Sequence, residues 1–286
     1  MADLGLREIH DYLVPLAREA GEIILQAAQS VSSIVEKQNS TDLVTETDQY
    51  VEAFLKNRLL QKFPLISFAF IGEESYSAGV QLTDDPTFIV DPIDGTLNFI
   101  HGFPFVACSI GLAVNKTPVV GVVYAPFLDK CYSAIAGEGS WVNEKPLPRI
   151  KRTTSTLQQC LVISEFGSDR GPKLDAKCET LKGLLAEKKA MVRGVRATGS
   201  AALNFCLVAE GCADLYWELG PWMWDVCAGY AILYEAGGKV VDGLPCQSFE
   251  DPGIESRRFL AVRGDMDSVV KEFWEMIQQV EILEQK

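Results

Sequence analysis

The sequence predicts a mixed α+β fold built from layers of α and β structure. Apolar residues recur at helical spacing near the N-terminus, β-branched runs bounded by turn residues follow, and both kinds of segment interleave toward the C-terminus. Segments that interleave in this way bury their apolar faces against one another in layers. We divide the 286 residues into an N-terminal half, residues 1–150, and a C-terminal half, residues 151–286, with a site between them.

The N-terminal half is predicted to begin with two helices. Apolar residues keep a helical period from Leu4 to about Val35, and Pro15 either kinks this helix or lies in its first turn. Residues 45–48, Thr-Glu-Thr-Asp, suit the start of a second helix because their side chains can cap free N–H groups. Strands are predicted at residues 65–71, 87–90, 105–114, 118–124 and 130–136, the last three as an antiparallel meander.

The C-terminal half is predicted to begin where prolines and the basic residues 149–152 break the strand pattern. Gly237-Gly238 is a stop signal for the helix that precedes it. The predicted strands are residues 161–164, 239–241 and 259–262, and the predicted helices are residues 175–188, 201–209 and 224–235.

The composition argues against nucleic acid or an anionic membrane as a partner. Lys and Arg number 26 and Asp and Glu number 39, and the net charge of -13 opposes attraction to polyanions. No stretch approaches the roughly 20 apolar residues of a membrane span, and charges interrupt the N-terminus where a secretory segment would be apolar. We therefore expect a cytoplasmic protein whose eight dispersed cysteines are small hydrophobes. With two histidines, a zinc site is disfavoured.

Several carboxylates stand at the ends of predicted apolar segments. Glu73 follows one strand, Asp91 and Asp94 follow another, and Asp225 stands at the opening of a late helix. Taken singly, Asp94-Gly95 can be a turn, Asp225 can favour the helix dipole, and Glu73 can be solvated. Taken together, carboxylates at the ends of buried strands are costly unless a cation meets them.

A compact set of oxygen ligands is typical of Mg²⁺ sites. Asp91 has two oxygens and can bridge two ions, as in two-metal phosphoryl chemistry. Pro92 is predicted to fix a turn that directs the Ile93 carbonyl toward the ions. Gly95 and Thr96 are predicted to open a short helix whose N–H groups face a phosphate.

The segments that carry these features resemble the inositol monophosphatase family, which consists of lithium-sensitive, magnesium-dependent phosphatases. The similar segments are, in chain order, residues 42–48, 72–75, 91–104, 224–229 and 235–238. Three acidic blocks in the right order are more specific than a single Asp-Pro-x-Asp-Gly-Thr block. The resemblance implies a five-layered αβαβα sandwich of the inositol monophosphatase and fructose-1,6-bisphosphatase type. It also implies a homodimer that hydrolyses inositol monophosphate, a small phosphorylated polyol.

The resemblance further implies roles for individual residues. Mg²⁺ would be held by Glu73, Asp91, the carbonyl of Ile93, Asp94 and Asp225. The catalytic residues would be Glu73, Thr96 and Asp48, with Thr96 hydrogen-bonded to Asp48 and orienting or deprotonating a water that attacks phosphorus directly. Substrate contacts would come from Asp94, Gly95, Thr96, Gly199, Ser200, Ala201, Glu218 and Asp225. Lys37 matches a loop lysine near the site in the family.

One departure from the family pattern bears on the substrate alcohol. Many members carry His-Cys before the Trp-Asp motif, whereas this chain has Pro221-Trp222-Met223. A bulky Trp222 can narrow the ring-binding side, so galactose 1-phosphate and histidinol phosphate remain alternative substrates. Fructose 1,6-bisphosphate and bisphosphate nucleotides are disfavoured, because the loops are short and no basic patch for a second phosphate is evident. A noncatalytic member would have lost an essential acid or Thr96, and this chain has lost none.

Overall fold

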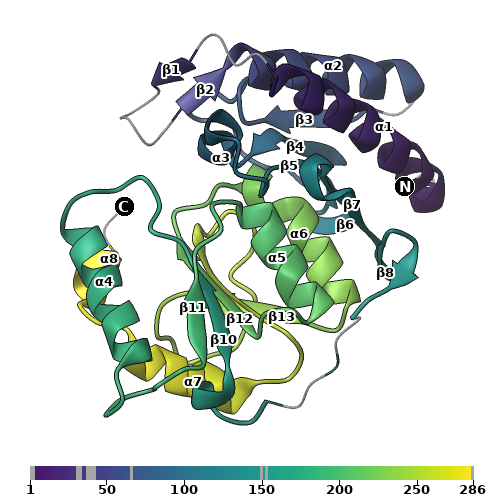
Figure 1. The fold of residues 1–286 in the computed structure, drawn as a ribbon. Coiled ribbons are helices and arrows are strands. Elements are labelled where there is room, and N and C mark those ends of the chain that lie inside the picture. Colours follow the sequence, from purple (N-terminus) through teal and green to yellow (C-terminus); the bar gives the residue numbers. More distant parts are fainter. Residues whose placement is uncertain are drawn as a thin grey trace.

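The computed structural model describes residues 4–29, 34–36, 43–64, 67–148, 151 and 154–284. It contains a seven-stranded sheet in the order β3-β4-β5-β6-β7-β8-β9 and a five-stranded sheet in the order β11-β10-β12-β14-β13. Strands β1 and β2 form a separate antiparallel pair. Helices cover the outer faces of both sheets and fill the space between them (Figure 1).

The bounds of the elements are as follows. The paired strands are β1 Ile34–Glu36 and β2 Leu43–Thr45, and the larger sheet contains β3 Ala69–Gly72, β4 Thr87–Asp94, β5 Ala107–Val114, β6 Thr117–Ala125, β7 Lys130–Ile135, β8 Gly139–Val142 and β9 Lys145–Pro146. The smaller sheet contains β10 Leu161–Ser164, β11 Gly194–Arg196, β12 Leu215–Leu219, β13 Lys239–Asp242 and β14 Arg258–Val262. The helices are α1 Leu6–Ala27, α2 Glu46–Lys62, α3 Thr96–His101, α4 Pro172–Leu185, α5 Ala201–Glu210, α6 Met223–Glu235, α7 Asp267–Met276 and α8 Val280–Leu283, with short 3-10 turns at η1 Pro126–Leu128 and η2 Leu157–Gln159.

The elements form five layers. Helices α1 and α2 pack on one face of the seven-stranded sheet through a core that includes Leu13 and Phe88. Helices α5 and α6 lie between the two sheets, where Phe205 and Tyr230 are buried. Helices α4, α7 and α8 cover the outer face of the five-stranded sheet, where Trp217 belongs to the core. The order of layers is αβαβα, which confirms the predicted fold class (Figure 1).

Helix α6 lies close against the seven-stranded sheet. It contacts β5 and β6, and a Cβ atom at Gly121 of β6 would lie 2.3 Å from the carbonyl oxygen of Ala228. Any larger residue at this position would push the helix away from the sheet. Asp225 is the third residue of α6, and Asp94 ends β4. The close packing therefore determines how near the carboxylates of these two elements come to each other.

Several boundaries differ from those predicted, and three of them bear on the site or on the chain course. Helix α1 ends at Ala27, and residues 34–36 form β1, because Ile34 and Val35 are β-branched and the segment pairs with β2. The strand expected at residues 65–71 is β3, from Ala69 to Gly72, and residues 65–66 lie outside the described ranges. Strand β4 continues past Asp91 to Asp94 with a shift of register against β5, so Pro92 lies in an irregular strand rather than in a turn. Proline has no N–H group and is tolerated where the ladder is interrupted.

Within the described ranges, no helix has both the length and the apolar character needed to cross a membrane.

Candidate active site

Three carboxylates from the carboxyl end of β4 and the start of α6 converge. One oxygen atom from each of Asp91, Asp94 and Asp225 lies within 4.8 Å of the other two. Asp91 is 1% exposed and Asp94 is also buried. Because β4 holds Asp91 and Asp94 and the N-terminus of α6 holds Asp225, the packing of α6 on the sheet brings together three of the predicted metal-binding residues.

Burial is the main cause that raises the pKa of all three carboxyl groups. The pKa of Asp94 rises to about 7, and the pKa values of Asp91 and Asp225 lie well above the ordinary range. For Asp91, the negative charges of Glu73, Asp94 and Asp225 are the next causes. A cation among these groups would favour their ionised forms and offset the cost of burying them. The donor set, which consists of oxygen atoms, therefore fits a hard divalent cation.

Glu73, the remaining predicted acid, lies in the turn after β3. Its negative charge raises the pKa values of Asp91, Asp94 and Asp225, and it shares a hydrogen bond with Asp91. Glu52 of α2 anchors this turn, because its Oε2 accepts a 2.7 Å hydrogen bond from the N–H of the next residue, Glu74. Glu52 was not among the residues predicted from the sequence.

Asp48 lies opposite the start of α3. The Thr96 hydroxyl lies 3.1 Å from Oδ1 of Asp48 and 3.1 Å from the carbonyl oxygen of Ile93. Oδ2 of Asp48 accepts hydrogen bonds from the N–H of Thr45, at 2.9 Å, and from the Thr45 hydroxyl. The bond from the Thr45 N–H is one half of the capping box of α2; in the other half, the Thr45 side chain accepts from a backbone N–H of the first turn. Burial raises the pKa of Asp48, and these hydrogen bonds oppose the shift. When the Thr96 hydroxyl donates to Asp48, its oxygen is left to accept a hydrogen bond from water.

Asp94 also links β4 to helix α5, because it caps that helix. The Ser200 hydroxyl donates to Oδ2 of Asp94, and the N–H groups of Ala201 and Ala202 donate to the same carboxylate at 3.3 and 2.8 Å. A carboxylate at a helix N-terminus satisfies free N–H groups and interacts favourably with the helix dipole. Ser200 and Ala201, predicted as substrate contacts, are thus hydrogen-bonded to Asp94.

The turn at Gly95 lies against the segment that precedes α5. Gly95 has a φ of 92°, and a Cβ there would lie 2.8 Å from the carbonyl oxygen of Phe105 and 3.1 Å from that of Gly199. Only glycine combines this backbone conformation with so little space. Asn98, which was not predicted as a site residue, also joins this turn to the segment before α5. Its Nδ2 donates to the carbonyls of Phe105 and Thr198, both at 2.7 Å.

Glu218, predicted to contact the substrate, is buried in β12 and accepts a hydrogen bond from the Tyr216 hydroxyl. Burial raises the pKa of Glu218 to about 8; the charge of Glu165 adds to the rise, and the charge of Lys177 opposes it. The charge of Glu218 contributes in turn to the raised pKa of Asp225. Glu218 therefore belongs to the same electrostatic environment as the three aspartates. Lys37 lies outside the described residues.

Trp222 belongs to an aromatic cluster beside Asp225. The N–H of Trp222 donates to the Asp225 carboxylate, and its ring stacks on that of Trp224 with centroids 5.3 Å apart. Tyr76, from the loop after β3, lies 5.0 Å from the Trp224 ring, and the Arg257 guanidinium lies 3.6 Å from the centre of the Trp222 ring. We call these packed rings the aromatic wall. Trp222, at the departure from the family pattern, therefore places this wall next to Asp225, a predicted metal ligand.

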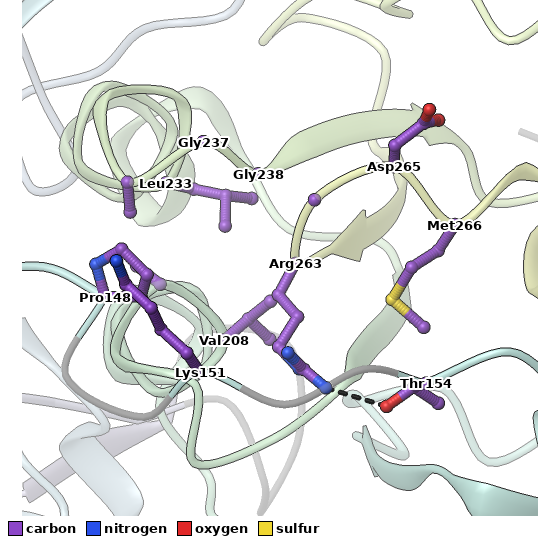
Figure 2. A pocket seen from close by; sticks show the side chains of 13 residues that line it. Pro148, Lys151, Thr154, Val208, Leu233, Gly237, Gly238, Arg263, Asp265 and Met266 are labelled. Carbon is purple, nitrogen blue, oxygen red and sulfur yellow. Dashed lines mark hydrogen bonds between the residues drawn. The ribbon is translucent and has the colours of Figure 1, made fainter.

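A cavity of about 390 Å³ lies elsewhere, between the C-terminal ends of α5 and α6 and the loop after β14 (Figure 2). Figure 2 shows Arg263 pointing across it toward Thr154, to which its Nη2 donates at 2.7 Å. The same guanidinium pairs with buried Asp214 at 2.8 Å. None of the predicted site residues lines this cavity, so it is separate from the acid cluster.

Comparisons with known proteins identify the family of the chain. The sequence model of the inositol monophosphatase family matches residues 6–278. The chain is 43% identical over 281 residues to inositol monophosphatase 2 of Saccharomyces cerevisiae, with 94% of each chain covered. It is 44% identical over 242 residues to inositol monophosphatase 1 of Homo sapiens, with 82% of this chain and 84% of that chain covered. Among solved structures, the inositol monophosphatase from Anabaena sp. PCC 7120 is similar with a TM-score of 0.76 and 32% identity, over 95% of both chains.

The acid cluster and these similarities define the class of the protein as a metal-dependent phosphatase. The chain belongs to the inositol monophosphatase family, as its sequence predicts.

Proposed function

We propose that the protein hydrolyses inositol monophosphate to myo-inositol and inorganic phosphate with Mg²⁺ as its metal. The observation that supports this most is the convergence of the Asp91, Asp94 and Asp225 oxygens within 4.8 Å of one another. Mg²⁺ prefers such carboxylate oxygens, commonly together with the phosphate of a substrate. The relatives named inositol monophosphatase support the choice of substrate.

The residues that would hold Mg²⁺ are Glu73, Asp91, Asp94, Asp225 and the carbonyl of Ile93. When bound, Mg²⁺ polarises the phosphoryl group and makes nearby water more acidic.

The chain itself would orient the attacking water and the phosphate. The Thr96 hydroxyl donates toward Asp48, at 3.1 Å, so that its oxygen can accept a hydrogen bond from the water and orient it toward phosphorus. The N–H groups of Gly95 and Thr96, where the chain turns into α3, would donate to phosphate oxygens. The water forms the new bond to phosphorus as the bond to the alcohol oxygen breaks, without a covalent enzyme intermediate.

The substrate alcohol would lie between Glu218 and residues 199–201. A carboxylate such as that of Glu218 can accept hydrogen bonds from ring hydroxyls. The aromatic wall at Trp222 gives a reason to keep galactose 1-phosphate and histidinol phosphate as alternative substrates, because its rings narrow the space next to Asp225.

The test is phosphate release from inositol 1-phosphate, galactose 1-phosphate and histidinol phosphate at one Mg²⁺ concentration, with a parallel series in EDTA. We expect inositol 1-phosphate to have the highest kcat/KM and EDTA to abolish the release. Absence of release from every substrate in saturating Mg²⁺ would contradict the proposed activity. A higher kcat/KM for another substrate would contradict the choice of inositol monophosphate and leave the phosphatase assignment in place.

We further propose that the protein is a cytoplasmic homodimer inhibited by lithium. These three properties rest on its membership of the family and on the sequence analysis. Sedimentation equilibrium, cell fractionation and the rate of phosphate release in increasing Li⁺ test them separately.

A further inference from the structure

A buried lysine lies behind the Glu218 side of the site. Lys177 of α4 is 4% exposed, and its Nζ donates to the carbonyl oxygens of Phe166 and Leu219, both at 3.1 Å. Phe166 lies just after β10 and Leu219 ends β12, and these two strands are parallel neighbours. One ammonium group thus joins the carboxyl ends of two parallel strands, where α/β sheets commonly bind their ligands.

The charge of Lys177 is balanced only at longer range. Among the described residues, no carboxylate forms a direct ion pair with its ammonium, and the attractive charges are those of Glu218, Asp169 and Glu165. Burial lowers the pKa of Lys177, and the charge of Glu218 opposes this shift most. A buried cation that has hydrogen bonds to carbonyl oxygens but no direct ion pair is still costly to bury, so stability alone is a weak reason for a lysine here.

Glu165, which directly follows β10, links Lys177 to the other side of the site. Its Oε1 accepts hydrogen bonds from the N–H of Thr198 at 2.7 Å, the N–H of Gly199 at 3.0 Å and the side-chain amide of Asn204 at 2.9 Å. These bonds hold the turn before α5, where Ser200 donates to Asp94. Two of the carboxylates whose charges act on Lys177 thus belong to the proposed alcohol pocket: Glu165 holds the turn on one side of it, and Glu218 lines it.

We infer that Lys177 is a positioning residue for the substrate alcohol. It joins the strands that present Glu165 and Glu218, and it supplies the positive charge that lets the half-buried Glu165 and the buried Glu218 face a polyol. The inference rests on the proposed function, because it assumes that Glu218 contacts the alcohol. The ligand class is a polyol, since a carboxylate accepts hydrogen bonds from hydroxyls, whereas a leaving group without hydroxyls would gain nothing from this arrangement.

The experiment compares Lys177→Met with the wild type on inositol 1-phosphate and on p-nitrophenyl phosphate, whose leaving group carries no hydroxyls. We expect the ratio of kcat/KM for inositol 1-phosphate to that for p-nitrophenyl phosphate to fall about tenfold, mostly through KM for inositol 1-phosphate. The control is Lys182→Met on the same helix, where the lysine side chain is 76% exposed, and this variant should keep the wild-type ratio. A loss of general structure would lower both values of kcat/KM together.

A second variant and a double mutant complete the test. Lys177→Arg retains the charge and should keep the ratio closer to that of the wild type than Lys177→Met does. In a Glu218→Gln background, Lys177→Met should change the ratio less than it does in the wild type. Lys177 acts through Glu218, and Glu218 is already altered in that background.

Two outcomes separate the inference from the proposed function. The role of Lys177 would be overturned if the wild type is active and folded Lys177→Met keeps the wild-type ratio. Fully additive effects of Lys177→Met and Glu218→Gln on this ratio would also overturn it. A wild type that releases phosphate from neither substrate in Mg²⁺ would overturn the proposed function and the inference with it. The melting temperature of each variant shows whether it is folded.

Discussion

The hydroxyl of Thr96 lies 3.1 Å from Oδ1 of Asp48, although the two residues belong to different helices and are 48 positions apart in the chain. Asp48 is fixed by the capping box of α2, and Thr96 is fixed at the first position of α3, directly after the glycine turn. Two separate helix starts therefore meet at one hydrogen bond beside the acid cluster. The hydroxyl of Thr96 has a second acceptor in the carbonyl oxygen of Ile93, also at 3.1 Å, so its oxygen is held between the two.

Thr96→Ala should lower kcat by about a hundredfold to a thousandfold, since it removes the group that orients the attacking water. Its fold should be retained, because Thr96 is partly exposed and Asp48 keeps its hydrogen bonds from Thr45. Thr96→Ser keeps the hydroxyl and is the matched control, with kcat expected within about tenfold of the wild type. Equal activity of Thr96→Ala and Thr96→Ser would contradict the role of the hydroxyl.

Asp225→Asn should raise the melting temperature of the metal-free protein and remove its response to Mg²⁺. The substitution takes away one of three mutually repelling carboxylates, while its side-chain oxygen can still accept the hydrogen bond from the N–H of Trp222. In the wild type, Mg²⁺ at a hundredfold excess over Kd should stabilise the fold by about 2.7 kcal/mol.

Thermal unfolding in EDTA and in Mg²⁺ measures both effects of Asp225→Asn. Asp175→Asn, which changes an exposed acid in the first turn of α4, is the control and should leave both melting temperatures near those of the wild type. A normal Mg²⁺ response in Asp225→Asn would count against the assignment of this residue as a metal ligand.

The stability of the metal-free protein should fall as pH rises through neutrality. Burial raises the pKa of Glu218 from 4.5 to about 8 in the folded state, so the folded protein holds this proton more tightly than the unfolded chain does. The contribution of the Glu218 proton to the free energy of unfolding is fully present below the unfolded pKa of 4.5. It is lost as pH rises through the folded pKa of about 8. The raised pKa of Asp94, about 7, acts in the same direction.

Melting temperatures of the wild type and Glu218→Gln across this pH range isolate the contribution of Glu218. Gln has no titrating group, so the decline of the melting temperature with pH should be shallower in the variant. Parallel curves for the two proteins would show that the environment of Glu218 does not disfavour its charge.

Gly121→Ala should destabilise the protein by about 1–3 kcal/mol, or more if the helix cannot move. The added Cβ would lie 2.3 Å from the carbonyl oxygen of Ala228, so α6 must move and carry Asp225 with it. We expect a weaker response of the melting temperature to Mg²⁺ for the same reason. Gly183→Ala, in a helical position where the nearest atom is 3.6 Å from the added Cβ, is the control and should keep or raise stability. Wild-type stability of Gly121→Ala would contradict the close packing of α6.

The sequence predicted the fold and the acid cluster because their signals are local. Short segments of chain show the apolar run that ends at Asp91 and Asp94, and they show the helix start at Asp225. The irregular end of β4 was not visible, since Pro92 suggests a turn and only pairing with β5 shows that the strand continues. Strand β12 was also missed, although it carries Glu218, because five residues give little periodicity on which to base a prediction.

The residues that support the site were harder to predict, because tertiary packing decides what they contact. Glu52 is four positions after Asp48 on α2, a spacing that places both on one face of the helix, but nothing local shows that this face is buried. Lys177 lies in a helix with several other charges, and only the positions of β10 and β12 explain its burial. The cap that Asp94 provides for α5 joins residues more than a hundred positions apart.

The central claim is that the oxygens of Asp91, Asp94 and Asp225 hold divalent ions together. Diffraction from crystals grown with Mn²⁺, which stands in for Mg²⁺ and scatters anomalously, tests this claim most directly. We predict anomalous peaks in contact with oxygens of all three carboxylates in the wild type and fewer or weaker peaks in Asp225→Asn. A wild-type map with no peak at these carboxylates, from crystals of an enzyme that is active in Mn²⁺, would contradict the claim.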